Sequence, residues 1–182
     1  FQFAEAMYDG TPREGITWGP WQASDRPPLL SGLLLLARDP IISSMGLRVN
    51  SEFVGTAYVI FAIVLLTSWV LPAYRLAELA RRGSGTWVVV IAALSPFFLF
   101  NSTYIWPKLL GATYALFALF ELLVARKRPA YGPGLVLAAC CASLALLSHA
   151  SNALVFPALA LLFLRTILRQ GWLAIATSLI VA

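Results

Sequence analysis

An adjacent pair of opposite charges, Asp25 and Arg26, stands before two prolines and an apolar run in the stretch WQASDRPPLLSG, residues 21–32. An arginine side chain presents a planar fork of donors that suits phosphate oxygens. The pair therefore either binds a lipid phosphate at the height of the membrane headgroups or forms a solvated loop pair that contributes little energy.

Two later positions hold polar side chains beside apolar runs. Lys108 lies between Pro107 and a long apolar stretch. It either extends its ammonium to the membrane surface or serves as a second cation for a phosphate. His149 is the single histidine, in the polar stretch SHASN at 148–152. A hydrogen-bonded structural residue is typical of such a position, and a metal site would need further ligands nearby.

The first acids of the chain, Glu5 and Asp9, are four residues apart, so one helix face could carry both. A solvated helix face is the alternative. The sequence contains no P-loop, GxSxG, HExxH or GxGxxG pattern. This argues against an ATPase, a serine hydrolase, a zinc protease and a dinucleotide enzyme.

Composition places these residues in a membrane protein. Of the 182 residues, 60% are hydrophobic and 12% are charged, about half the charged share of a soluble domain. The net charge of +5 follows from basic clusters beside apolar runs, which indicates membrane topology rather than nucleic-acid binding. The adjacent Cys140 and Cys141 predict apolar packing rather than a disulfide framework.

A spanning helix needs about 20 apolar residues. The sequence predicts an all-α, polytopic transmembrane bundle at residues 53–182, with six spans at 53–73, 86–101, 103–125, 132–148, 152–168 and 171–182. Lys and Arg concentrate in cytoplasmic loops. With six crossings, the three basic clusters fall on one side; these are Arg75/Arg81/Arg82, Arg126/Lys127/Arg128 and Arg165/Arg169.

The same topology puts residues 1–52 outside the cell membrane, as an extracytoplasmic first loop. The run LLSGLLLLA, residues 29–37, is too short to span and is followed by Arg38, Asp39 and Pro40. We predict one or two short interfacial helices within 29–50, beginning near Leu29. The chain begins with Phe and stops within an apolar run, so we expect a piece of a longer protein of the plasma (inner) membrane.

The order of these segments resembles the membrane-embedded GT-C glycosyltransferases, in the branch that includes lipid A aminoarabinose transferases and protein O-mannosyltransferases. The stretches that carry the resemblance are ASDRPPLLSG, SPFFLFNSTYIWPKLL and LLSHASNALVFP. The resemblance implies a multi-pass enzyme that moves a sugar from a polyprenyl-phosphate carrier to an acceptor on the outer face. It also implies a catalytic acid in the first outer loop.

Single residues take their roles from the same resemblance. Asp25 and Arg26 match an acid-Lys-Pro-Pro step, so Arg26 is expected near the carrier phosphate. Lys108 stands where many members carry an acid, and His149 is expected to face the carrier headgroup. The family's register places the catalytic acid before Phe1, which leaves Asp25 and Asp9 as the candidates within this chain. The acceptor, the cofactor and a requirement for a divalent cation stay open.

Two alternatives need no covalent chemistry in this chain. One is a polytopic transporter or lipid-handling subunit, although few polar residues at mid-depth disfavour an ion pathway. The other is a degenerate GT-C scaffold that lacks the catalytic acid.

Overall fold

The computed structural model describes residues 10, 17–18, 21–22, 29–45, 52–103, 107–128 and 132–171. The prediction of an all-α protein is confirmed for this part, apart from a two-residue antiparallel pair, β1 (Thr17–Trp18) and β2 (Trp21–Gln22). The helices are α2 (Leu29–Met45), α3 (Glu52–Thr67), α4 (Val70–Ala80), α5 (Gly85–Leu94), α6 (Pro96–Thr103), α7 (Lys108–Lys127), α8 (Gly132–Ser148), the 3-10 helix η3 (Ala150–Leu154) and α9 (Phe156–Gln170).

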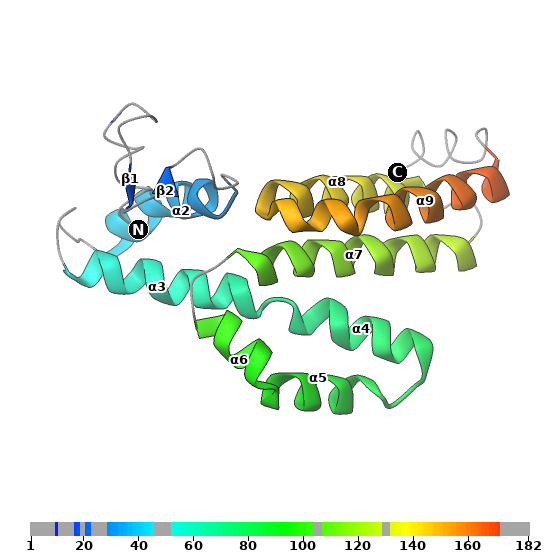
Figure 1. The fold of residues 1–182 in the computed structure, drawn as a ribbon, viewed down its shortest axis with the longest axis horizontal. Coiled ribbons are helices and arrows are strands. Elements are labelled where there is room, and N and C mark those ends of the chain that lie inside the picture. The colour runs from blue at the N-terminus through cyan, green and yellow to red at the C-terminus, as the bar shows by residue number, and fades with distance from the viewer. Residues whose placement is uncertain are drawn as a thin grey trace.

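The helices run back and forth along one direction. Helices α7, α8 and α9 lie side by side, α3 and α4 follow one another below them, and α5 returns beneath α4 (Figure 1). As a result, the α4–α5 loop and the last turns of α7 and α9 lie at one end of the bundle. The first turn of α7 and the α8–α9 turn lie at the other end, near α2 (Figure 1).

Two apolar clusters hold this arrangement together. The first joins α2 to α3 and the start of α7, through Leu30, Leu34, Tyr58, Ala62, Leu66, Trp69, Leu109 and Leu110. The second joins α7, α8 and α9 and contains small residues such as Ala118, Ala125 and Ala138. Small side chains allow two helices to approach closely, and α7 and α8 form the most extensive helix pair described. Cys141 is buried as predicted, whereas Cys140 is exposed.

Among the described residues, two helices are long and apolar enough to cross a membrane, Gly55–Ala80 and Lys108–Lys127. The pair α5 and α6 adds a third if it forms one span. These helices fit a membrane protein, but they are fewer than the six spans predicted. The predicted span at 171–182 lies almost wholly outside the described residues.

The lengths of α8 and α9 explain why these two helices are not among those long enough to cross a membrane. Helix α8 has the predicted bounds and 17 residues, and α9 has 15 residues. At 1.5 Å per residue these helices are about 26 and 23 Å long, against a hydrocarbon core of about 30 Å. The predicted span at 152–168 is instead divided between η3 and α9, and α9 carries Arg165 and Arg169.

The predicted span at 86–101 is divided between two helices, because α5 and α6 meet at a bend of 74°. The break falls at Ser95, whose ψ of 130° is extended rather than helical. The following residue, Pro96, explains it: a proline ring disfavours helical backbone at the residue before it and removes one helix hydrogen bond.

Helix α2 begins at Leu29 as predicted and continues through Pro40 to Met45, so of the one or two helices predicted within 29–50 the structure has one that passes the proline. A proline within a helix leaves the carbonyl four residues earlier without its donor. That carbonyl belongs to Leu36, whose side chain is 76% exposed, and Pro40 is exposed as well. The lost bond therefore lies on the face turned away from the core, and the helix continues.

Candidate functional site

The predicted site residues divide into two groups. Asp9, Asp25 and Arg26 lie outside the described residues. Lys108 and His149 are described, and both lie at the end of the bundle where α7 begins and α8 ends (Figure 1). We call this the polar end, defined by Lys108 and residues 148–152.

Lys108 occupies the first position of α7. Pro107 precedes it with a φ of −69°, and the carbonyl of Pro107 accepts a hydrogen bond from the backbone N–H of Gly111 at 3.0 Å. A proline is suited to a helix start because its fixed φ is close to that of a helix. Lys108 is exposed, whereas Leu109 and Leu110 are buried. The two leucines fix the first turn of α7 and thereby position the lysine at its edge.

His149 begins the turn between α8 and α9. Its Nδ1 accepts a hydrogen bond from the backbone N–H of Ser151 at 3.1 Å, and the Ser151 hydroxyl lies 2.7 Å from the same nitrogen. A backbone N–H can only donate, so Nδ1 is the unprotonated nitrogen of the neutral ring. The proton then lies on Nε2, which is a hydrogen-bond donor.

Asn152 closes the same turn and joins it to α7. Its side-chain amide donates to the carbonyl of Ala145 at 2.9 Å and to that of His149 at 3.1 Å. Gly111 of α7 packs directly on this amide, since a Cβ at position 111 would overlap the Asn152 nitrogen and lie 3.3 Å from the Cβ of Ser148. The absence of a side chain at Gly111 thus lets the side chains of the histidine turn pack against the first turn of α7.

The electrostatics of the turn reflect this approach. Burial lowers the pKa of His149 below its ordinary value, and the positive charge of Lys108 lowers this pKa further. The fold therefore favours the neutral ring at neutral pH, with its proton on Nε2. Lys108 and His149 are 41 residues apart in sequence (149 − 108) and electrostatically coupled in the folded protein.

Arg38 is a buried cation on α2, and it was not among the predicted site residues. It is 3% exposed and follows Leu30 and Leu34 at intervals of four along the inner face of α2. The two leucines pack in one cluster with Leu109 and Leu110, which directly follow Lys108. The spacing of four from Leu30 is the sequence signal that could have indicated this inner face.

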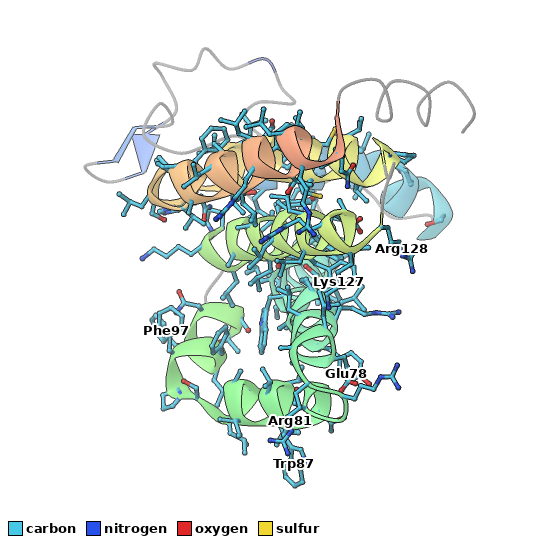
Figure 2. The ribbon with its side chains drawn as sticks, turned by 90° about the vertical axis from the view of Figure 1, so that its right-hand side faces the viewer. Glu78, Arg81, Trp87, Phe97, Lys127 and Arg128 are labelled. Carbon is cyan, nitrogen blue, oxygen red and sulfur yellow. The ribbon has the colours of Figure 1, made fainter. Side chains whose placement is uncertain are left out.

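The opposite end of the bundle, which we call the basic end, carries the three basic clusters. Arg81 and Arg82 are exposed in the α4–α5 loop, Lys127 and Arg128 at the end of α7, and Arg169 at the end of α9. Figure 2 looks onto this end and shows Lys127 and Arg128 above the α4–α5 hairpin that carries Arg81. The helix directions thus gather these charges at a single end, far along the helices from Lys108 and His149.

Glu78 organises the loop at the basic end. Its carboxylate accepts the backbone N–H of Gly83 at 3.0 Å and that of Gly85 at 2.7 Å. The first N–H groups of a helix have no partner within the helix, so Glu78 caps the start of α5. Gly83 has a φ of +81°, which favours glycine at this point of the turn.

Among the residues that the structure describes, no group of three or more His, Cys, Asp or Glu side chains could hold a metal ion. What the polar end offers is a set of hydrogen-bond donors and positive charge suited to an anionic group. No family model, curated protein or solved structure matches this chain.

Proposed function

We propose that this protein is a membrane glycosyltransferase that moves a sugar from a polyprenyl-phosphate carrier to an acceptor at the outer face of the membrane. The observation that supports the proposal most directly is the meeting of Lys108 and His149 at the polar end. The expected catalytic base comes from the first loop, where Asp9 and Asp25 are the candidates, and Arg26 is a third phosphate contact.

In the proposed reaction, a hydroxyl or amine of the acceptor attacks the anomeric carbon of the sugar. The carboxylate takes the acceptor's proton. The bond between the anomeric carbon and the phosphate oxygen breaks, and the polyprenyl phosphate leaves with the electron pair. The Lys108 ammonium and the Nε2–H of His149 stabilise the charge that develops on that phosphate. A neutral histidine suits this role because its proton stays on the donor nitrogen.

The proposal includes a multi-pass topology of six spans in the plasma (inner) membrane. The polar end and residues 1–52 face outward, and the basic end faces the cytoplasm, as the concentration of Lys and Arg predicts. The short helices α8 and α9 pack on the longer α7. A bilayer can thin locally around short spans at a modest energetic cost.

Sugar transfer tests the proposal. Membranes that contain the full chain are incubated with radiolabelled polyprenyl-phosphate sugars, and label in lipid and protein acceptors is counted. We expect transfer by the wild type, and a loss on the order of 100-fold for Lys108→Ala or His149→Ala, because each change removes a donor to the leaving phosphate. Lys127→Ala is the matched control, since it removes an exposed lysine at the other end of α7.

A lipid-handling protein without covalent chemistry is the second candidate. It is favoured by the positive charge of Lys108 and the hydrogen-bond donor of His149 at the polar end, which suffice to hold a lipid phosphate without a catalytic base. Wild-type membranes that bind a polyprenyl phosphate but transfer no sugar would favour this candidate. Full transfer by both the Lys108 and His149 variants would exclude the proposed roles of these residues.

A further inference from the structure

An apolar cavity of about 530 Å³ lies between the α3–α4 junction, α5 and α7. Its walls include Val64, Leu71, Val89, Val90 and Phe117, and it opens to the surface of the bundle. This volume is within the range of about 300–1,000 Å³ that is usual for small-molecule sites. The cavity adjoins both apolar clusters, because its wall residue Val70 packs against the first and Phe117 packs against the second.

The hydroxyl groups that line the cavity at the α3–α4 junction are already bonded. Thr67 donates to the carbonyl of Ile63 at 2.9 Å. Ser68 bonds to the carbonyl of Leu65 and lies 3.3 Å from the hydroxyl of Thr113. An occupant therefore finds apolar surface there, which suits a hydrocarbon chain.

The cavity extends along α4 and α5 toward the loop that joins them. Tyr74 and Thr86 line it, and both lie close to this loop in sequence. The loop carries the exposed Arg81 and Arg82, whose side chains make no hydrogen bond or ion pair with the described part of the chain. Glu78 instead bonds the backbone N–H groups of Gly83 and Gly85, so the loop is fixed while both guanidinium groups stay available.

An exposed aromatic side chain lies next to the α4–α5 loop. Trp87 is 69% exposed on the first turn of α5 and points away from the bundle (Figure 2). Tryptophan is enriched where the hydrocarbon core meets the headgroups. In the proposed topology, the α4–α5 loop therefore lies at the level of the lipid phosphates, and the cavity lies beside the acyl chains.

We propose that this cavity retains one acyl chain of an anionic phospholipid whose phosphate binds Arg81 and Arg82. The charge of the two guanidinium groups selects the anionic headgroup, and the apolar walls hold the chain. This site is separate from the proposed carrier site, because it lies at the basic end and uses neither Lys108 nor His149.

Native mass spectrometry of the full chain from mixed micelles tests the proposal, with phosphatidylglycerol and phosphatidylcholine as the probes. We expect the wild type to retain one phosphatidylglycerol in preference to phosphatidylcholine. The double variant R81Q/R82Q should lose this retention at least about fivefold, because it removes both phosphate contacts. The matched variant K127Q/R128Q removes equal charge from the neighbouring loop and should lose less than about twofold.

A third variant tests binding of the acyl chain separately from binding of the headgroup. Val90→Trp fills the cavity and leaves every charge in place, so it should also lower phosphatidylglycerol retention. Equal losses in the two charge variants, or wild-type retention by Val90→Trp, would overturn the proposal. Single changes R81Q and R82Q replace the double variant if it does not fold. K108A/H149A should retain phosphatidylglycerol normally. This result would show that the lipid site at the basic end is independent of the proposed carrier site.

Discussion

The two ends of this bundle carry positive charge in different ways. At the polar end, Lys108 begins α7 and its charge acts on the neutral ring of His149, which is held by Ser151. At the basic end, Arg81, Arg82, Lys127 and Arg169 are exposed around helix ends. A few charges in fixed positions suit one specific anion, whereas many exposed charges create a field that attracts a membrane surface.

The ends also differ in how their loops are built. Close packing of Gly111 on Asn152 forms the polar end, whereas hydrogen bonds from the loop backbone to Glu78 form the α4–α5 turn. Added volume should therefore damage the polar end most, and loss of one carboxylate should damage the basic end most.

The largest effect is expected for Gly111→Ala. The new methyl group would overlap the Asn152 amide and crowd Ser148. Either the amide gives up its hydrogen bonds to Ala145 and His149, or α7 moves away from the histidine turn. Overpacking of this kind costs about 1–3 kcal/mol, and thermal unfolding in detergent measures it. The control is Gly32→Ala in α2, where a Cβ meets nothing within 4 Å. That change should raise stability slightly, because alanine favours a helix more than glycine does. Equal destabilisation by both changes would contradict the packing that we describe.

A smaller, local effect is expected for Glu78→Ala. The backbone N–H groups of Gly83 and Gly85 lose their acceptor, so the start of α5 should open more often. Hydrogen exchange of amides in the α4–α5 loop should become faster, while exchange at the α8–α9 turn should stay unchanged. Glu78→Gln keeps one carbonyl oxygen and should give an intermediate rate. Unchanged exchange in Glu78→Ala would show that the carboxylate does not hold this turn.

The smallest effect concerns the pKa of His149. Lys108→Gln removes the positive charge that lowers this pKa, so the pKa should rise, although burial still holds it below its ordinary value. The single histidine gives one imidazole signal in a nuclear magnetic resonance titration. Lys127→Gln, at the other end of α7, should leave the pKa unchanged. An equal rise in both variants would show that Lys108 has no specific proximity to the ring.

The same pKa fixes how pH affects stability. The pKa of His149 in the folded protein is below the ordinary value of 6.5, so the unfolded chain takes up the proton first as the pH falls. The contribution of the neutral ring to stability is therefore fully present above about pH 6.5. It is lost progressively below that pH, until the folded pKa is reached. His149→Gln should remove this part of the pH dependence.

Local sequence signals predicted some elements well. The helix beginning at Leu29 and the turn at 148–152 follow from prolines and from the charge of the loops, and both agree with the structure. The continuation of α2 past Pro40 was not predictable from the proline itself. It depends on which face of the helix is packed, and this is a tertiary property.

The candidate site was only partly predictable for the same reason. Lys108 and His149 were identifiable as polar residues beside apolar runs, but their proximity depends on the packing of Gly111 against Asn152. Arg38 was missed because its burial follows from the contact of α2 with α3 and α7. Glu78 was missed because a cap formed across a loop has no short sequence motif.

Photo-crosslinking compares the two ends most directly. The full chain is labelled in membranes with a photoreactive polyprenyl phosphate, and the modified peptides are identified by mass spectrometry. We predict label at residues 107–111 and 148–152, and a strong loss of this label in Lys108→Ala. Absence of label at residues 107–111 and 148–152, or labelling at 107–111 that Lys108→Ala leaves unchanged, would contradict the assignment of the carrier phosphate to the polar end.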